Sequence, residues 1–163
     1  MYREAALWSV AALAVRLLFL VATPHVIDSA DSIRYLEVAQ RVARGEFAQI
    51  DPRIPILYPA RCAAANAITG DLERAGLMVS LAASSAVLLP LFVLAFAMHG
   101  ISCARVAALM AVLWPWPVDY GCRVAPEALA SFLWFLAIVA LVRSAHAPIT
   151  ASLATALALF LLH

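Results

Sequence analysis

Long apolar runs alternate with short polar segments along most of the chain. We expect membrane-spanning helices at about 5–23, 76–98, 104–118, 127–142 and 148–162. At about 1.5 Å per residue, the first run rises about 28 Å, which is enough to cross the hydrocarbon core of a bilayer. This run is longer than the apolar part of a signal peptide and more runs follow it, so we expect it to stay in the protein.

A polar and amphipathic stretch, residues 24–75, separates the first two apolar runs. Residues 32–44 repeat apolar positions with helical spacing, and Gly45 is a typical helix stop. The pattern predicts an amphipathic helix in the membrane interface. Residues 54–70 are apolar but interrupted by prolines, which favours a second, interfacial or re-entrant helix. We expect a polar turn at residues 71–74.

The composition indicates that the predicted helices lie in a membrane. The 163 residues are 66% hydrophobic and 13% charged, with a mean hydropathy of +0.95. Soluble domains are about 45–50% apolar and about 25% charged, so lipid must cover part of this surface. We predict an all-α, polytopic transmembrane helix bundle that forms a single domain, 1–163. No basic tract indicates a nucleic acid partner.

The charges are distributed unevenly between the two membrane sides that these spans predict. With a cytoplasmic N-terminus, the outer segments hold nine of the ten acidic residues but also seven of the eleven arginines. The positive-inside rule favours the opposite orientation. All basic residues are arginines, which is typical of a GC-rich bacterial genome, and we predict a multi-pass protein of the cell (inner or plasma) membrane.

Cysteines and the chain end add two expectations. Cys62, Cys103 and Cys122 show no metal-binding spacing and are expected to pack as small apolar residues, with a Cys62–Cys122 disulfide as the less favoured alternative. The last run, 148–162, is short for a span and has no polar flank. We therefore expect the sequence to be a fragment of a longer protein.

Several short motifs follow one another in a fixed order. The first span carries Arg16, and the amphipathic helix begins with Asp31 and includes Tyr35. The segment 55–59 (PILYP) comes next, and after two more spans a short loop ends at Glu127, which opens the following span. This order resembles the N-terminal half of GT-C fold glycosyltransferases, the group of protein O-mannosyltransferases and lipid A aminoarabinose transferases.

The resemblance implies a substrate and roles for individual residues. Family members transfer a sugar from a polyprenyl-phosphate donor to an acceptor, whose identity the motifs do not give. Asp31 matches the catalytic base and Glu127 a second site acid, and both are candidate ligands of a divalent metal such as Mg or Mn. In the family, a second acidic residue directly follows this aspartate. Ser32 occupies that position here, and Asp28 is the candidate substitute for the missing acid. The candidate substrate-binding residues are Arg16, Asp28, Tyr35, Tyr58 and Arg123.

Each candidate also has an ordinary structural explanation. Asp28, Asp31 and Glu127 lie where they can cap helices or favour a helix N-terminus. Arg16 can extend to lipid headgroups or pair internally instead of holding the donor phosphate. Tyr58 and Tyr120 fit an interfacial aromatic belt. Arg53, Arg61 and Arg123 can contact either lipid phosphates or the donor phosphate. His25 is a weak ligand candidate, because a lone interfacial histidine is usually not a ligand.

The function predicted from the sequence is that of a membrane glycosyltransferase portion acting at the outer membrane face. Its expected partners are membrane lipid, a lipid-linked sugar donor and an acceptor. Two alternatives stay open: a non-catalytic assembly subunit, and a transporter or flippase component for a lipid-linked sugar. The uncharged centres of the later spans count against coupling to an ion gradient.

Overall fold

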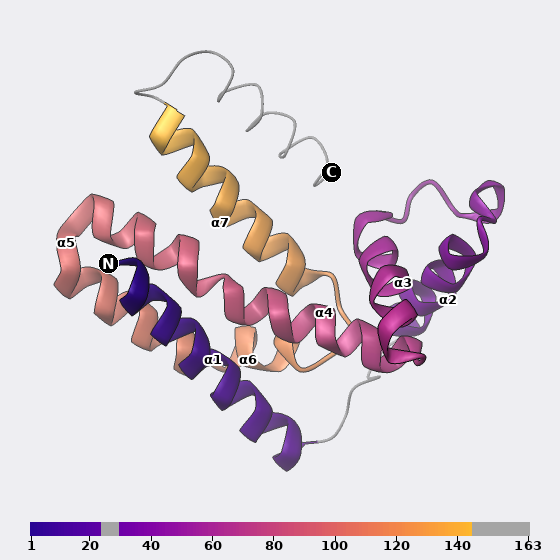
Figure 1. Ribbon diagram of the computed structural model, residues 1–163, viewed down its shortest axis with the longest axis horizontal. Coiled ribbons are helices and arrows are strands. Elements are labelled where there is room, and N and C mark those ends of the chain that lie inside the picture. The colour runs from indigo at the N-terminus through magenta and orange to yellow at the C-terminus, as the bar shows by residue number, and fades with distance from the viewer. Residues whose placement is uncertain (24–29, 145–163) are drawn as a thin grey trace.

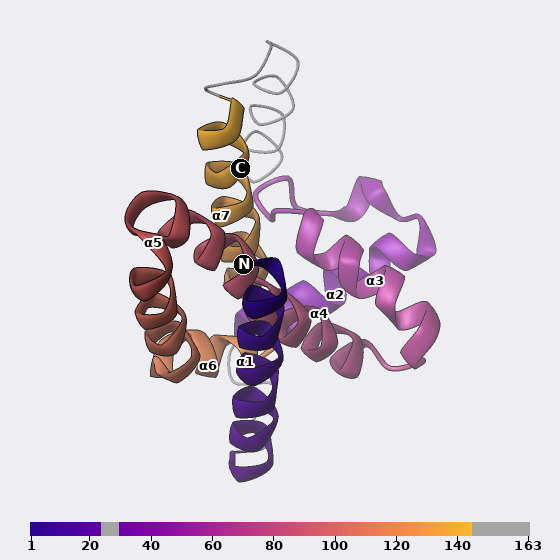
Figure 2. The ribbon, with the colours of Figure 1, turned by 60° about the vertical axis from the view of Figure 1, so that its left-hand side comes forward.

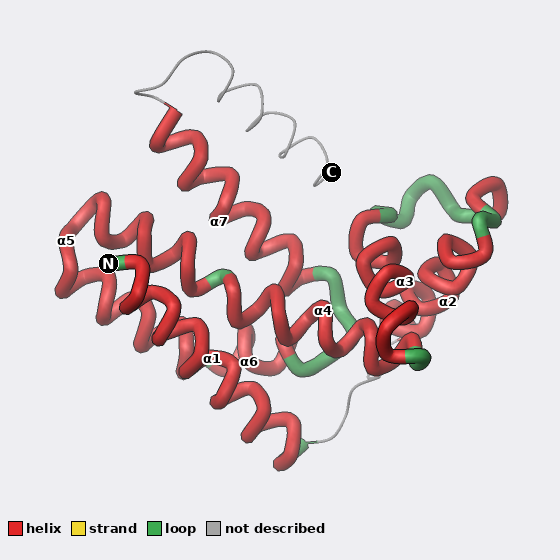
Figure 3. Tube along the Cα trace, viewed as in Figure 1, coloured by secondary structure: helices red, strands yellow, loops and turns green. Residues whose placement is uncertain are grey.

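The computed structural model describes residues 1–23 and 30–144, and this part of the chain is helical without any strand (Figure 3). The elements are α1 (Tyr2–Ala22), α2 (Ala30–Arg44), a 3-10 turn η1 (Phe47–Gln49), α3 (Leu57–Thr69), α4 (Leu72–Ala86), α5 (Leu88–Leu113), α6 (Pro115–Gly121) and α7 (Glu127–Ser144). The all-α prediction is confirmed for these residues. Asp28, His25 and the run 148–162 lie outside them.

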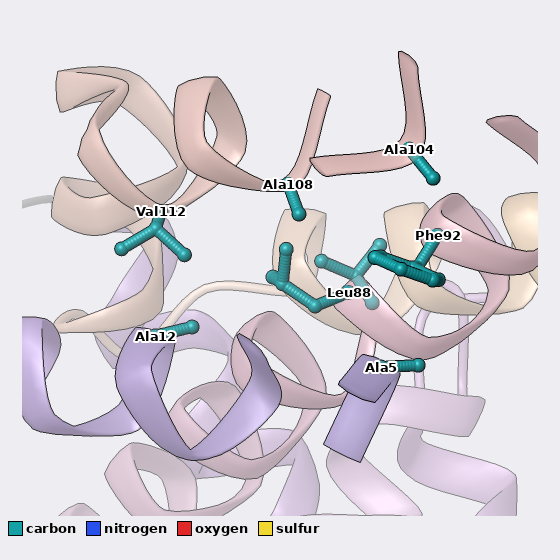
Figure 4. Packing of buried hydrophobic residues seen from close by; sticks show 8 residues of the cluster. Ala5, Ala12, Leu88, Phe92, Ala104, Ala108 and Val112 are labelled. Atoms are coloured by element: carbon teal, nitrogen blue, oxygen red, sulfur yellow. The ribbon is translucent and has the colours of Figure 1, made fainter. Parts of the chain in front are cut away.

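Helix α1 packs along α5 through small residues (Figure 1). Ala5 and Ala12 on α1 are fully buried against a cluster that includes Ala104 and Ala108 on α5. Alanine side chains let two helix backbones approach closely, which is how helices associate where lipid removes the hydrophobic drive. Figure 4 shows these alanines around Leu88 and the other large side chains of the cluster.

The long apolar stretch Leu72–Leu113 is divided at two places. Helix α4 ends at Ala86 and α5 begins at Leu88, because Pro90 has no N–H to donate to the carbonyl of Ala86. Val87, which lies between the two helices, keeps a helical backbone with φ −56° and ψ −25°. Gly100 has φ 79° and ψ −174°, and α5 turns back there (Figure 1).

The helix predicted at 104–118 ends earlier than expected. It stops at Leu113, because Trp114 precedes Pro115 and adopts an extended backbone with ψ 123°. Pro115 then starts the separate short helix α6, since its fixed φ suits the first helical position. Trp116 therefore lies on the short helix α6 and not at the end of α5.

Helices α2 and α3 pack on each other and on α4, to one side of the other helices (Figures 1 and 2). The amphipathic helix predicted at 32–44 is confirmed, and Gly45 follows it with φ 75°. The polar turn predicted at 71–74 is wrong. Asp71 accepts hydrogen bonds from the backbone N–H groups of Glu73 and Arg74, so α4 already begins at Leu72.

Two segments of the described residues are long and apolar enough to cross a membrane, α1 and the stretch Leu72–Leu113. One face of α1 is open, with Leu18 72% and Val21 84% exposed. The three cysteines are free, so the alternative of a Cys62–Cys122 disulfide is wrong.

Candidate functional site

The loop between α6 and α7, residues 122–126, is the centre of the candidate site, and we call it the site loop. Three helices hold it. The hydroxyl of Ser32 on α2 donates to the Val124 carbonyl at 2.8 Å. The Cys122 thiol donates to the carbonyl of Arg16 on α1 at 3.2 Å. Because Ser32, Val124 and Cys122 are all buried, water does not compete for these bonds.

The third anchor of the site loop comes from α4. The hydroxyl of Ser80 donates to the Ala125 carbonyl at 3.2 Å and lies 3.0 Å from the hydroxyl of Tyr58. Tyr58 is 2% exposed, and it also donates to the Gly76 carbonyl at 3.2 Å. Its burial raises the pKa of its hydroxyl far above the ordinary range. Tyr58 therefore supports the site loop through Ser80, and it lines neither of the two cavities beside that loop.

A small polar cavity, which we call the acid pocket, lies between the start of α2 and the site loop. Its volume is about 230 Å³. It brings together four residues that the sequence had singled out, Asp31 and Tyr35 from one side and Arg123 and Glu127 from the other. The rest of its lining is Ser32, Tyr120, Val124 and Pro126. Residues about ninety positions apart in the sequence thus share one concave surface.

The electrostatics of the acid pocket agree with this geometry. Burial raises the pKa of the Tyr35 hydroxyl, and the carboxylates of Glu127 and Asp31 raise it further. Tyr35 is consequently a protonated hydroxyl between two acids at neutral pH. The Arg123 guanidinium is held by Asp119 at 2.8 and 2.9 Å, so one arginine stands beside the two acids with its orientation fixed.

Arg16 lies inside the helix bundle and not at a lipid headgroup. It is 0% exposed, so of its two ordinary explanations the internal pairing is confirmed and the extension to lipid headgroups is wrong. Its Nε donates to the Ser84 hydroxyl at 2.8 Å and one terminal nitrogen donates to the Ala12 carbonyl at 3.0 Å. Its other terminal nitrogen has no partner among the described residues. A Cβ at Gly121 would lie 2.3 Å from the Ser84 Oγ, so only glycine permits this packing.

An apolar cavity of about 210 Å³ adjoins the acid pocket, and Tyr120 and Glu127 line both. Its other walls are Ser84, Val87, Trp114, Trp116, Pro117, Ala128 and Ser131. The rings of Trp116 and Tyr120 stack with centroids 5.4 Å apart. The sequence interpretation missed this role of Tyr120. The spacing of Trp116 and Tyr120, one helical turn apart after Pro115, is the signal that could have indicated it.

The acids of the pocket can supply part of a metal site. Among residues 1–23 and 30–144, no three His, Cys, Asp or Glu side chains gather closely enough to hold a metal ion. Asp31 and Glu127 provide two carboxylates. This set fits Mg²⁺, which is commonly held by one or two carboxylates together with water and substrate phosphate oxygens.

Comparison of the chain with protein-family models, with curated proteins and with solved structures gave no match. The functional argument therefore rests on the residues of the site themselves.

Proposed function

We propose that this chain is part of a multi-pass membrane glycosyltransferase that uses a polyprenyl-phosphate sugar. The observation that carries the proposal is the shared wall of two unlike cavities. Asp31, Arg123 and Glu127 line the polar one, Trp114 and Trp116 line the apolar one, and Tyr120 lies between them. A ligand with a charged head and an apolar tail fits this pair of cavities.

The reaction assigns a task to each charged residue. An acceptor hydroxyl attacks the anomeric carbon of the donor, the bond from that carbon to the phosphate oxygen breaks, and Asp31 takes the hydroxyl proton. Polyprenyl phosphate leaves with the electron pair of the broken bond. Arg123, oriented by Asp119, stabilises the charge that develops on this phosphate. Tyr35 remains protonated and can donate a hydrogen bond to a sugar or phosphate oxygen.

Glu127 has a second task in this scheme. It lines both cavities, which supports a role near the junction of sugar and lipid in the proposed complex. A divalent metal held by Asp31 and Glu127 would add positive charge at the donor phosphate. Arg16 contributes differently: it is buried behind the apolar cavity and reaches Ser84, which lines that cavity.

The first test is binding of a short-chain polyprenyl monophosphate to the detergent-purified protein, followed by tryptophan fluorescence. Trp114 and Trp116 line the apolar cavity, so saturable binding should change their emission. Trp116→Phe should reduce that change, with Trp114 left as the remaining reporter. Trp134→Phe is the matched control, because Trp134 is exposed on α7 and lines neither cavity. An equal response in both variants would contradict the proposed site.

The second test is transfer itself, measured as release of polyprenyl phosphate from a panel of polyprenyl-phosphate sugars by the whole protein. Asp31→Asn should lower the rate by about 10²–10⁴-fold, the usual contribution of a general base, while binding of the monophosphate survives. Glu37→Gln is the control, because Glu37 is exposed on the same helix and lines neither cavity. Transfer that tolerates Asp31→Asn would refute the role of Asp31.

A non-catalytic subunit that binds the lipid-linked sugar is the second candidate function. The observation in its favour is Ser32. Its hydroxyl is 3% exposed and donates to the Val124 carbonyl, so the pocket lacks the second acid of the motif. Binding of the monophosphate without any transfer, in the wild-type whole protein, would favour this function over the enzyme.

A further inference from the structure

A second, larger groove lies between α3, α4 and α7. Its volume is about 570 Å³, and it shares no lining residue with the acid pocket or the apolar cavity. All of its lining residues but one are apolar, among them Leu57, Ile68, Ala82 and Phe132. The exception is Arg61, and we call the feature the Arg61 groove.

Arg61 is the only charged residue of this lining. It is exposed, and it has no ion pair or hydrogen bond with any residue of the described ranges. Arg123, in contrast, is bound by Asp119 and Arg105 by Glu4. A cation without a partner beside an apolar groove is complementary to an anion that carries an apolar chain. Arginine is well suited to such a ligand, because its planar fork binds phosphate through two hydrogen bonds.

We propose that the Arg61 groove binds an anionic glycerophospholipid, with an acyl chain along the alanines of α3 and α4 and the phosphate at Arg61. This inference rests on the proposed membrane location but not on sugar transfer. The opening is consistent with a ligand from the bilayer, because Ile68 on its wall is 87% exposed. The size lies within the range of about 300–1,000 Å³ that is usual for ligand sites. The bound lipid would fasten α3 to α4 and α7.

The test is lipid retention in the delipidated protein, counted by native mass spectrometry after addition of phosphatidylglycerol or phosphatidylcholine in neutral detergent. Wild type should retain one phosphatidylglycerol in preference to phosphatidylcholine. Arg61→Gln should lower that preference roughly fivefold, the effect of one arginine near an anionic lipid surface. Arg44→Gln is the matched control, since Arg44 is an exposed arginine on α2 that lines none of the three cavities.

A second variant tests the groove itself. Ala82 is exposed on the groove wall, so Ala82→Trp can fill the space without disturbing a buried contact, and it should abolish retention of both lipids. Retention that is unchanged in Arg61→Gln and Ala82→Trp would overturn the proposal. A further overturning result would be an Ala82→Cys thiol that a thiol reagent does not label in the lipid-free protein. Such a result would mean that protein already fills the groove. Asp31→Asn should leave lipid retention intact, which separates this result from a failure of the proposed transfer.

Discussion

Replacing Ser32 tests whether the site loop depends on a single hydroxyl. The Ser32 side chain is 3% exposed, and its hydroxyl donates to the Val124 carbonyl at 2.8 Å. Ser32→Ala removes the donor and leaves a buried carbonyl without this partner. Ser32→Asp restores the second acid of the glycosyltransferase motif, but an ionised carboxylate has no proton to give to Val124.

The two variants should differ in cost. Losing a buried hydrogen bond, with the acceptor left unsatisfied, costs about 1–3 kcal/mol. For a chain of this length, about 1 kcal/mol shifts the melting temperature by about 2–4 °C, so Ser32→Ala should melt roughly 2–12 °C lower. Ser32→Asp places an unpaired charge against a carbonyl oxygen in a buried position, and it should be less stable than Ser32→Ala.

The assay is thermal unfolding in a mild detergent, combined with binding of the polyprenyl monophosphate. Ser102→Ala is the control, because Ser102 is an exposed serine on α5 that lines neither cavity, and its change should stay within about 0.5 kcal/mol. Binding should weaken in Ser32→Ala as well, since Arg123 and Glu127 stand on either side of the freed segment. By this reasoning, position 32 carries a serine and not the motif's second acid because its hydroxyl must donate to Val124. A Ser32→Asp protein as stable as wild type would refute it.

Three further predictions follow from single contacts. Gly121→Ala should destabilise the protein by about 2–4 kcal/mol in thermal unfolding, because the new Cβ would displace Ser84 and break its bond to Arg16. Asp71→Ala should cost about 1 kcal/mol in the same assay through loss of the α4 cap, whereas Asp71→Asn should cost less. Burial raises the pKa of the Cys62 thiol from 9.0 to about 11. The contribution of the neutral thiol to the free energy of unfolding is therefore complete below about pH 9, and it falls by about 3 kcal/mol as the pH rises to about 11. A Cys62→Ala protein whose melting temperature falls as steeply over this range would contradict this.

The elements and their chemistry were predictable wherever a local pattern determined them. The amphipathic helix α2 follows from its 3.6-residue repeat and from Gly45 after it, and both are confirmed. Helix ends near prolines were less predictable. The sequence indicates that Pro90 and Pro115 disturb helices, but the exact residue depends on which carbonyl loses its donor and on how the preceding residue relaxes.

The composition of the acid pocket was predicted better than its support. Asp31, Tyr35, Arg123 and Glu127 were candidates from their residue types and order, and the fold places all four around one cavity. The hydroxyl of Ser80, which helps to hold the site loop, carries no signal in the sequence. A buried serine differs from an ordinary helix residue only through its long-range partner, here Ala125.

The surroundings of Arg16 stayed open for a related reason. Its place in the first apolar run allowed either a side chain that reaches the membrane surface, as long charged side chains usually do, or one that pairs internally. The fold instead offers it Ser84 and a space that Gly121 leaves open. Whether an arginine in a span turns outward or inward depends on what the neighbouring helices present, and these contacts join residues far apart in the sequence.

The contacts along α1 and α7 show that the candidate site and the N-terminus lie at opposite ends of these helices. On α1, Glu4 pairs with Arg105 at 2.6 Å, whereas the backbone carbonyl of Arg16, about 18 Å further along the helix, accepts a hydrogen bond from Cys122 of the site loop. On α7, Arg143 donates to the hydroxyl of Tyr2 at one end, and Glu127 lines the acid pocket at the other. Two independent helices thus place the chain start at the end opposite the candidate site. This separation is what the proposed function requires, because the proposed lipid-linked donor would present its head at one membrane face only.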